Sequence, residues 1–391
     1  MSPKRRRSGP RLVLSRALLL LLLVGGSLLA TEAILRWKSP PHDGYSLYPP
    51  DLDYVFDPAP GVMPGISEPS RFRSNSDGLR ADELSDDDRA RVLCIGGSTT
   101  ACIFLDQDET WTAILQRLLG ERSGLATWVG NAGKDGMTSR DHVVQLETIL
   151  PRVPDVDLVL VLAGVNDLLL RLSQGRAYDP DAMSRPATRE ALLVHAFSVR
   201  PDAGRSAFED LRLVQLVRSL VRPAVVQGRL MDPQGDWYVS RRRQRARARI
   251  LPELPDLSTS LDEFARNLGT LADFAAARGT RLVLVTQPSL WRDDLSPELS
   301  ALLWLGGRGD FMNTDVEEYY AVDALLGGLE AYNEVTRRVA AARGLPCIDL
   351  AVDLPKDLSV FYDDVHFNEA GAALVAERLA DALLTLEPFA R

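Results

Sequence analysis

The segment FYDDVHFNEAG at 361–371 places an acid three residues before His366. Histidine ionises near neutral pH, and a carboxylate on the same turn can hold the second ring nitrogen of the imidazole. Such a histidine can take the proton of a serine hydroxyl, which is otherwise a weak nucleophile. Asp363 and His366 therefore predict general-base chemistry. Asp364 is an alternative carboxylate, although the three-residue spacing favours Asp363. Ordinary helix capping beside a solvated histidine would give the same pattern without chemistry.

A candidate nucleophile lies far from this segment in the sequence. Ser98 follows two glycines, which let the backbone turn sharply and expose the hydroxyl at the start of a helix. Attack on an ester carbonyl creates an oxyanion that needs preorganised hydrogen-bond donors. The backbone N–H groups of Ser98 and Gly136 and the side-chain amide of Asn166 supply three such donors. These residues lie in the blocks GGST (96–99), NAGKDG (131–136) and GVND (164–167).

Five short apolar runs alternate with segments of helical spacing, which predicts an α/β domain around a parallel sheet of five strands. The expected strands cover 91–95, 126–131, 157–163, 281–287 and 346–350. Ligands bind outside the carboxyl ends of the strands in such a sheet. Four of the five runs lead into one of the blocks that contain Ser98, Gly136, Asn166 and His366. We therefore expect these residues to meet at one edge of the sheet.

The blocks GGST, NAGKDG, GVND and DDVH, in this order, resemble those of the SGNH (GDSL-type) hydrolase superfamily, and in particular its membrane-anchored bacterial members. The resemblance covers about 91–167 and 280–391. It implies a flavodoxin-like three-layer α/β/α sandwich and hydrolysis of esters or thioesters, with no metal or organic cofactor. Carried over to this chain, it implies a catalytic triad of Ser98, His366 and Asp363 and oxyanion donors Ser98, Gly136 and Asn166. The first block departs from the usual Gly-Asp-Ser, because Gly97 replaces the Asp.

The N-terminus predicts export. Four basic residues at 4–7 and Arg11 precede a largely apolar stretch at 12–35. As a helix, this stretch would be about 36 Å long, enough to cross a bilayer core. The basic residues favour a cytoplasmic N-terminus, with the rest of the chain on the other side of the membrane. A cleaved signal peptide is the alternative, which would leave the domain secreted.

These patterns divide the chain into three parts: a basic tail and transmembrane anchor at 1–37, a linker and irregular extension at 38–90, and a hydrolase domain at 91–391. No convincing sheet strand lies between 168 and 258, so we expect a helical insertion there. This insertion contains RRRQRARAR at 241–249. Its arginines fall on several helix faces, which predicts a solvated surface, with contact to anionic lipid or acidic glycan as the alternative.

The remaining residues narrow the classes of function. A net charge of −9 over 391 residues argues against general nucleic-acid binding. The three cysteines are too few for a disulfide framework, and we expect Cys94 and Cys347 to be buried apolar residues. Trp291 and Trp304 could stack on sugars, but core packing is an equal expectation. The other histidines, at 42, 142 and 195, are expected to have structural or surface roles.

The first hypothesis for function is an exported, membrane-tethered serine esterase that removes acyl groups from an envelope glycan or lipid. Acyl transfer to a sugar hydroxyl uses the same triad and remains open. A catalytically silent domain for glycan binding or envelope assembly is the alternative from a different class. The expected partners are an acylated substrate and the membrane, without nucleic acid. The sequence leaves the substrate and the oligomeric state undetermined.

Overall fold

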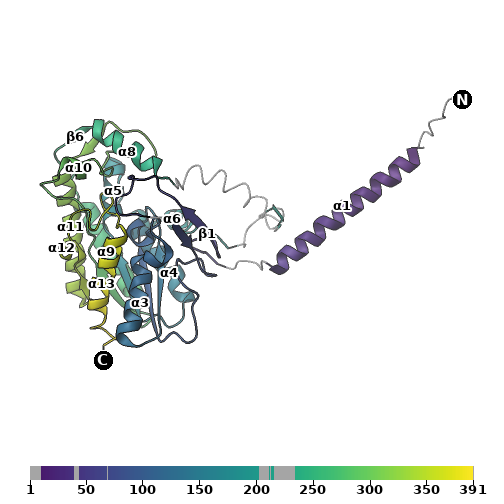
Figure 1. Ribbon diagram of the computed structural model, residues 1–391, viewed down its shortest axis with the longest axis horizontal. Helices are drawn as coiled ribbons and strands as arrows, with labels where there is room; N and C mark the ends of the chain where they lie inside the picture. The colour runs from purple at the N-terminus through teal and green to yellow at the C-terminus, as the bar shows by residue number, and fades with distance from the viewer. Residues whose placement is uncertain are drawn as a thin grey trace. The chain divides into compact units, whose positions relative to one another are not determined.

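The computed structural model describes residues 10–38, 44–67, 69–201, 211, 213–214 and 234–390 (Figure 1). The chain divides into two compact units. The first comprises Met1–Gly44 and Arg200–Met231, and it contains helix α1 (Pro10–Lys38). The second comprises Tyr45–Val199 and Asp232–Arg391, and it holds every predicted site residue.

A five-stranded parallel sheet forms the centre of the second unit, with strand order β4-β3-β5-β7-β9. This order is that of the flavodoxin-like doubly wound sheet. The strands are rich in valine, leucine and isoleucine because both faces of a parallel sheet are covered. The predicted fold class is confirmed. The strands are β3 (Ala90–Gly96), β4 (Thr127–Gly133), β5 (Leu158–Leu162), β7 (Arg281–Val285) and β9 (Cys347–Ile348).

Helices cover both faces of this sheet (Figure 1). Helix α3 (Trp111–Ser123) packs against α13 (Glu369–Leu383), and α9 (Ser258–Ala276) packs between α4 (Ser139–Ile149) and α11 (Val322–Arg343). The apolar positions that predict these helices are buried, as in α3, where the stripe follows the helical repeat. The shorter α-helices of this unit include α2 (Ser98–Ala101), α5 (Val165–Gln174), α10 (Pro297–Ser300) and α12 (Leu350–Asp353).

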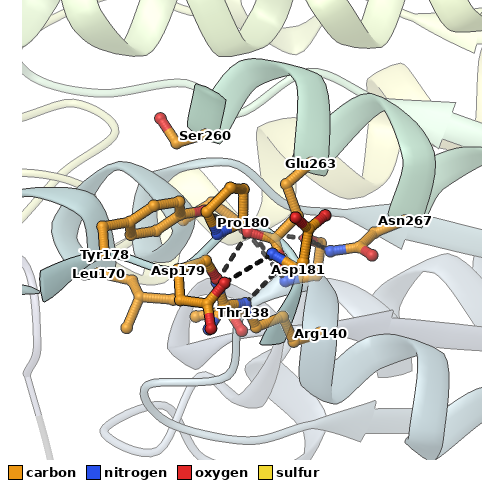
Figure 2. Close-up of polar contacts among 12 residues, drawn as sticks. Thr138, Arg140, Leu170, Tyr178, Asp179, Pro180, Asp181, Ser260, Glu263 and Asn267 are labelled. Atoms are coloured by element: carbon orange, nitrogen blue, oxygen red, sulfur yellow. Dashed lines mark hydrogen bonds and ion pairs between the residues drawn. The ribbon is translucent and has the colours of Figure 1, made fainter. Parts of the chain in front are cut away.

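A buried ion pair joins two helices of one layer (Figure 2). Arg140, on α4, donates two hydrogen bonds of 2.7 Å to the carboxylate of Glu263, on α9. Arg140 also donates to the Asp179 carbonyl, and the Tyr178 hydroxyl donates to Glu263. The pair therefore fixes α4 relative to α9 and to the segment that follows α5.

The insertion is helical in the parts that the structure describes, with one exception. It includes α6 (Pro186–Ala196) and α8 (Asp236–Arg247), as predicted. The exception is strand β6 (Arg249–Leu251), which pairs in parallel with β8 (Glu318–Tyr320) outside the main sheet. Three residues with partly exposed side chains give too short a pattern to predict a strand.

The arginines of α8 do not all face solvent. Arg245 is only 7% exposed and donates to the carbonyls of Leu305 and Tyr320. The expectation of a solvated surface is therefore wrong for this residue. Its guanidinium is buried because a planar group with five donors can satisfy several carbonyls at once.

Residues 45–90 pack within the second unit and carry an antiparallel pair of strands, β1 (Asp53–Phe56) and β2 (Ser70–Arg73). Arg80 follows them and is buried. It donates to the carbonyls of Ala101, Cys102 and Leu105, the first two at 2.6 and 2.7 Å. This extension therefore braces the chain just after the helix that begins with Ser98.

The cysteine predictions are half correct. Cys94 is buried in the middle of β3, as expected, whereas Cys347 is exposed. The prediction for Cys347 is wrong because β9 is a two-residue strand at the edge of the sheet. One side of an edge strand has no neighbouring strand to cover it.

Helix α1 belongs to the first unit. Within the described residues it contains the one span long and apolar enough to cross a bilayer, Arg16–Arg36. Glu32 pairs with Arg36 one turn later along the helix, at 2.8 Å, which partly neutralises the acid near the end of the span. A signal sequence meets the same criteria, so the anchor and the cleaved signal both stay predictions.

Candidate active site

The structure brings a serine from near the start of the second unit against a histidine from near its end. Ser98 is the first residue of α2 and directly follows β3. The preceding turn is tight, because a Cβ on Gly96 would lie 2.1 Å from the Thr100 hydroxyl and 3.0 Å from the Leu162 carbonyl. The Ser98 hydroxyl lies 2.8 Å from Nε2 of His366.

The turn before α13 positions His366 and its carboxylate together. Asp363 Oδ1 accepts hydrogen bonds from the backbone N–H groups of Val365 and His366, at 3.0 and 2.9 Å. Asn368 ends the turn by capping α13. Because these bonds span at most three residues, the local sequence is sufficient to place the carboxylate beside the ring.

The imidazole lies between the hydroxyl and the carboxylate. Nδ1 of His366 is 2.9 Å from Oδ1 and 2.8 Å from Oδ2 of Asp363. An ionised carboxylate only accepts hydrogen bonds, so Nδ1 carries a proton and Nε2 is left to accept from Ser98. This order of groups can remove the Ser98 proton and stabilise the resulting imidazolium.

The electrostatics of the pair favour the same arrangement. Burial lowers the pKa of His366, but the charge and hydrogen bond of Asp363 outweigh it, so the pKa lies above its ordinary value. Burial raises the pKa of Asp363, but the His366 charge, together with hydrogen bonds from His366 and Trp304, lowers it below the usual range. Asp363 therefore stays ionised at neutral pH. His366 acts as a base once the pH exceeds its raised pKa.

Asp364, the alternative partner of His366, points elsewhere. It accepts from the indole N–H of Trp291 at 2.8 Å and from the backbone N–H groups of Trp304 and Leu305 at 2.7 and 3.2 Å. Burial raises the pKa of Asp364, and the charge of Asp363 adds to the effect. Of the two acids, the structure therefore places Asp363 against the imidazole.

The expected oxyanion donors lie on two neighbouring connections. Asn166 is in the first turn of α5, and its Nδ2 donates to the Met137 carbonyl at 2.9 Å. Gly136 has a φ of 73°, a conformation that favours glycine, and it lies in the loop after β4. Lys134 precedes Gly136 by two residues and donates its backbone N–H to the Gly96 carbonyl at 3.1 Å. The segment that leads to Gly136 is therefore attached to the turn that carries Ser98, and the Asn166 amide lies beside Gly97 of the same turn.

The same contacts explain the departure at Gly97. Its φ of −87° is open to any residue, so the backbone does not require glycine. A Cβ there would lie 2.5 Å from Nδ2 of Asn166 and 3.5 Å from the Met137 carbonyl oxygen. An Asp at this position would displace the Asn166 amide.

His142 and His195 lie apart from this arrangement. His142 is buried in α4 and contacts Gln145 at 3.1 Å. His195, at the end of α6, lies 2.9 Å from Asp141. His42 lies outside the residues that the structure describes. The structural roles expected for His142 and His195 fit these contacts.

The role of Trp304 was not predicted from the sequence. Both Trp291 and Trp304 are buried, at 0% and 3% exposure, and each indole N–H donates to an acid of the DDVH block. Trp304 donates to Asp363 across 59 residues of sequence, and its ring is parallel to that of His366 at 6.3 Å. No local spacing predicts such a contact.

Residues 94–254 match the family model of the GDSL-like lipase/acylhydrolase family. This part of the chain is therefore identified as a GDSL-like lipase/acylhydrolase domain, which supports an ester-bond hydrolase. The matched region contains Ser98, Gly136 and Asn166 but ends before Asp363 and His366. For the last two, the support in the structure is their contact with each other and with Ser98.

Several solved structures of hydrolases are similar to this one. The lipase/acylhydrolase from Enterococcus faecalis has 14% identity and a TM-score of 0.39, over 75% of this chain and 95% of that chain. The aryl esterase of M. smegmatis has 14% identity and a TM-score of 0.40, over 76% and 99%. The acetylxylan esterase Axe2 from Geobacillus stearothermophilus has 14% identity and a TM-score of 0.39, over 77% and 95%. No curated protein matches the chain.

Proposed function

We propose that this SGNH hydrolase is an exported, membrane-tethered serine esterase in which Ser98, His366 and Asp363 form the catalytic triad. The observation that carries the proposal is the unbroken chain of hydrogen bonds from the Ser98 hydroxyl through His366 to Asp363, with links of 2.8 Å. A domain retained only for binding would not need this chain, because each link orients the next for proton transfer.

The reaction follows from the order of the groups. His366 Nε2 takes the Ser98 proton as the hydroxyl oxygen attacks the ester carbonyl, which gives a tetrahedral oxyanion. The imidazolium then protonates the oxygen of the leaving group as its bond to the carbonyl carbon breaks, which releases the alcohol and leaves the acyl group on Ser98. Water, activated by the same imidazole, attacks this acyl-enzyme and releases the carboxylic acid. Asp363 keeps its negative charge throughout and stabilises the imidazolium in both steps.

The oxyanion would be bound by the backbone N–H groups of Ser98 and Gly136 and by the side chain of Asn166. Nδ2 of Asn166 has two hydrogens, and one bond to Met137 leaves the second for the substrate. Removing one donor of this kind costs about 2.7–4 kcal/mol of transition-state stabilisation. The charge develops where these groups are already fixed, so little reorganisation is needed.

A fluorophosphonate probe tests the triad directly, because it phosphonylates only an activated serine. The full-length protein in detergent is expected to label on Ser98 at neutral pH, and Ser98→Ala is expected to lose the label. The same variant should lower hydrolysis of aryl esters by about 10³-fold or more. Ser240→Ala, on the exposed face of α8, is the matched control and should behave like the wild type. Labelling that persists in Ser98→Ala would contradict the proposal.

The proposed substrate is an acylated glycan or lipid of the cell envelope, in keeping with the predicted export. Aryl esters of increasing chain length, together with acetylated glycans, would separate these classes by their kcat/KM values. Acyl transfer shares the acyl-enzyme and differs only in the acceptor. Adding a sugar acceptor and measuring the ratio of transfer product to free acid separates transfer from hydrolysis.

A further inference from the structure

We propose that Trp304 is a positioning residue for the triad, held in place by Asp364 and by the arginines of α8. The inference rests on the proposed function, since it concerns the orientation of Asp363. It also assigns a purpose to two features that the triad leaves unexplained. These are the second acid of the DDVH block and the arginine-rich run at 241–249.

The first step is the coordination of Asp363, which is fully buried. Its Oδ1 receives two backbone N–H groups, from Val365 and His366. Apart from the imidazole, its Oδ2 accepts from the indole N–H of Trp304, at 2.8 Å. The backbone donors can fix one oxygen, but two fixed oxygens are needed to fix the plane of a carboxylate. Trp304 therefore sets the rotation of Asp363 about its terminal bond.

The second step is the support of Trp304 itself. Its backbone N–H donates to Oδ2 of Asp364 at 2.7 Å, while its indole reaches Asp363. The two adjacent acids thus hold the two ends of one tryptophan. The indole ring also lies parallel to the ring of His366, at 6.3 Å between centroids. A displacement of Trp304 would therefore change the positions of both Asp363 and His366.

The third step is the attachment to α8. Arg242 donates to the Leu302 carbonyl at 3.0 Å, and Arg245 donates to the Leu305 carbonyl at 2.6 Å. These carbonyls lie on the two sides of Trp304 in the sequence. The second branch of Arg245 bonds the Tyr320 carbonyl at 3.0 Å, so the guanidinium ties the loop to β8. The arginine-rich helix therefore acts as a brace for the loop that carries Trp304.

The chain contains a matched pair for the test. Trp304 and Trp291 are both buried, and each donates one indole hydrogen bond of 2.8 Å to one of two adjacent acids. Trp304→Phe and Trp291→Phe remove the same group and keep an aromatic ring. We expect similar decreases in Tm for the two full-length variants. For Trp304→Phe alone, kcat for an aryl ester should fall about 10- to 100-fold, with KM unchanged.

Loss of kcat of equal size in both variants, or no loss in Trp304→Phe, overturns the assignment. A second readout does not depend on turnover: the downfield proton resonance of His366 Nδ1–H. It should shift in Trp304→Phe and stay constant in Trp291→Phe, and constancy in both overturns the assignment. The two proposals can fail separately. If the resonance shifts in Trp304→Phe and not in Trp291→Phe, but the wild-type protein neither hydrolyses esters nor labels on Ser98, only the proposed function is refuted.

Arg245→Lys is a second test of the proposal that can be used if the Trp304→Phe variant does not fold. Lysine keeps the positive charge, but one ammonium group cannot bond both the Leu305 and Tyr320 carbonyls in the geometry of the guanidinium. We expect a smaller fall in kcat than for Trp304→Phe, again at constant KM. An unchanged kcat in this variant would count against the brace.

Discussion

The space beside Gly97 is filled by the side-chain amide of Asn166. A Cβ at position 97 would come within 2.5 Å of its Nδ2, which is closer than carbon and nitrogen can approach without bonding. The amide can move more easily than the backbone, because it is at the end of a side chain, whereas the Gly97 backbone is part of the turn before Ser98. Any side chain at 97 is therefore expected to move Asn166 before it disturbs the fold.

This predicts that restoring the usual Gly-Asp-Ser pattern impairs the enzyme. Gly97→Ala and Gly97→Asp should each lower kcat for ester hydrolysis about 10²-fold, as expected when one oxyanion donor is lost. Asn166→Ala should cost about as much, and adding Gly97→Ala to it should cost little more, because the group that was displaced is already absent. Gly327→Ala is the control, since a Cβ on this glycine of α11 meets nothing within 4 Å. Additive losses in the double variant would contradict the explanation.

At this scale, the sequence predicted what depends on short spacing. Asp363 and His366 are joined by bonds within three residues, so the spacing in the DDVH block favoured Asp363 and left Asp364 as the alternative. The indole bond of Trp304 spans 59 residues, and the arginines that hold its loop come from another segment again. Such contacts depend on tertiary packing, which no local pattern encodes.

Among the elements, α4 and α9 are joined by the buried pair of Arg140 and Glu263, whose side chains are 9% and 3% exposed (Figure 2). Breaking a buried pair leaves a charge without a partner, and this typically costs about 3–5 kcal/mol. Replacing both residues by apolar ones of similar size removes the unpaired charge and is often close to neutral.

Arg140→Met is therefore expected to lower the free energy of unfolding by about 3–5 kcal/mol, measured by chemical denaturation. Arg140→Met with Glu263→Met should recover most of this loss. The matched control is Arg122→Met, which breaks the ion pairs that Arg122 on α3 makes with Glu377 and Asp381 on α13. These pairs are largely exposed and screened by water, so their loss should cost much less than breaking the buried pair. If the double variant is no more stable than Arg140→Met, the buried pair itself makes a net favourable contribution to the free energy of unfolding.

The elements that the sequence predicted are those with long, uniform patterns. Five apolar runs predicted the main sheet, because strands buried on both faces are apolar throughout. The helical repeat of apolar residues predicted α3 and α9. The pair of β6 and β8 escaped prediction, because the three residues of β6 have no alternation to detect. The unexpected exposure of Cys347 has the same origin, since the sequence does not say which strand lies at an edge.

At the scale of the whole molecule, α1 is distinctive because it exposes apolar side chains, which a water-soluble enzyme does not need. Leu20 and Leu21 are 64% and 69% exposed, and no residue of the span Arg16–Arg36 is buried in a protein core. A helix that is apolar on all sides needs an apolar surrounding, which a bilayer supplies. The basic residues at 4–7 favour the orientation that exports the remaining chain.

We therefore expect the full-length protein, with a C-terminal tag, to stay in the membrane fraction after alkaline carbonate extraction and to retain its original N-terminus. The tagged domain should be digested by protease added outside the cytoplasmic membrane. Leu21→Arg should weaken retention, because an arginine near the centre of a span costs about 2.5–3.5 kcal/mol for insertion. A soluble product with a shortened N-terminus would instead identify a cleaved signal peptide. A domain that resists external protease until the membrane is permeabilised would show that it is not exported.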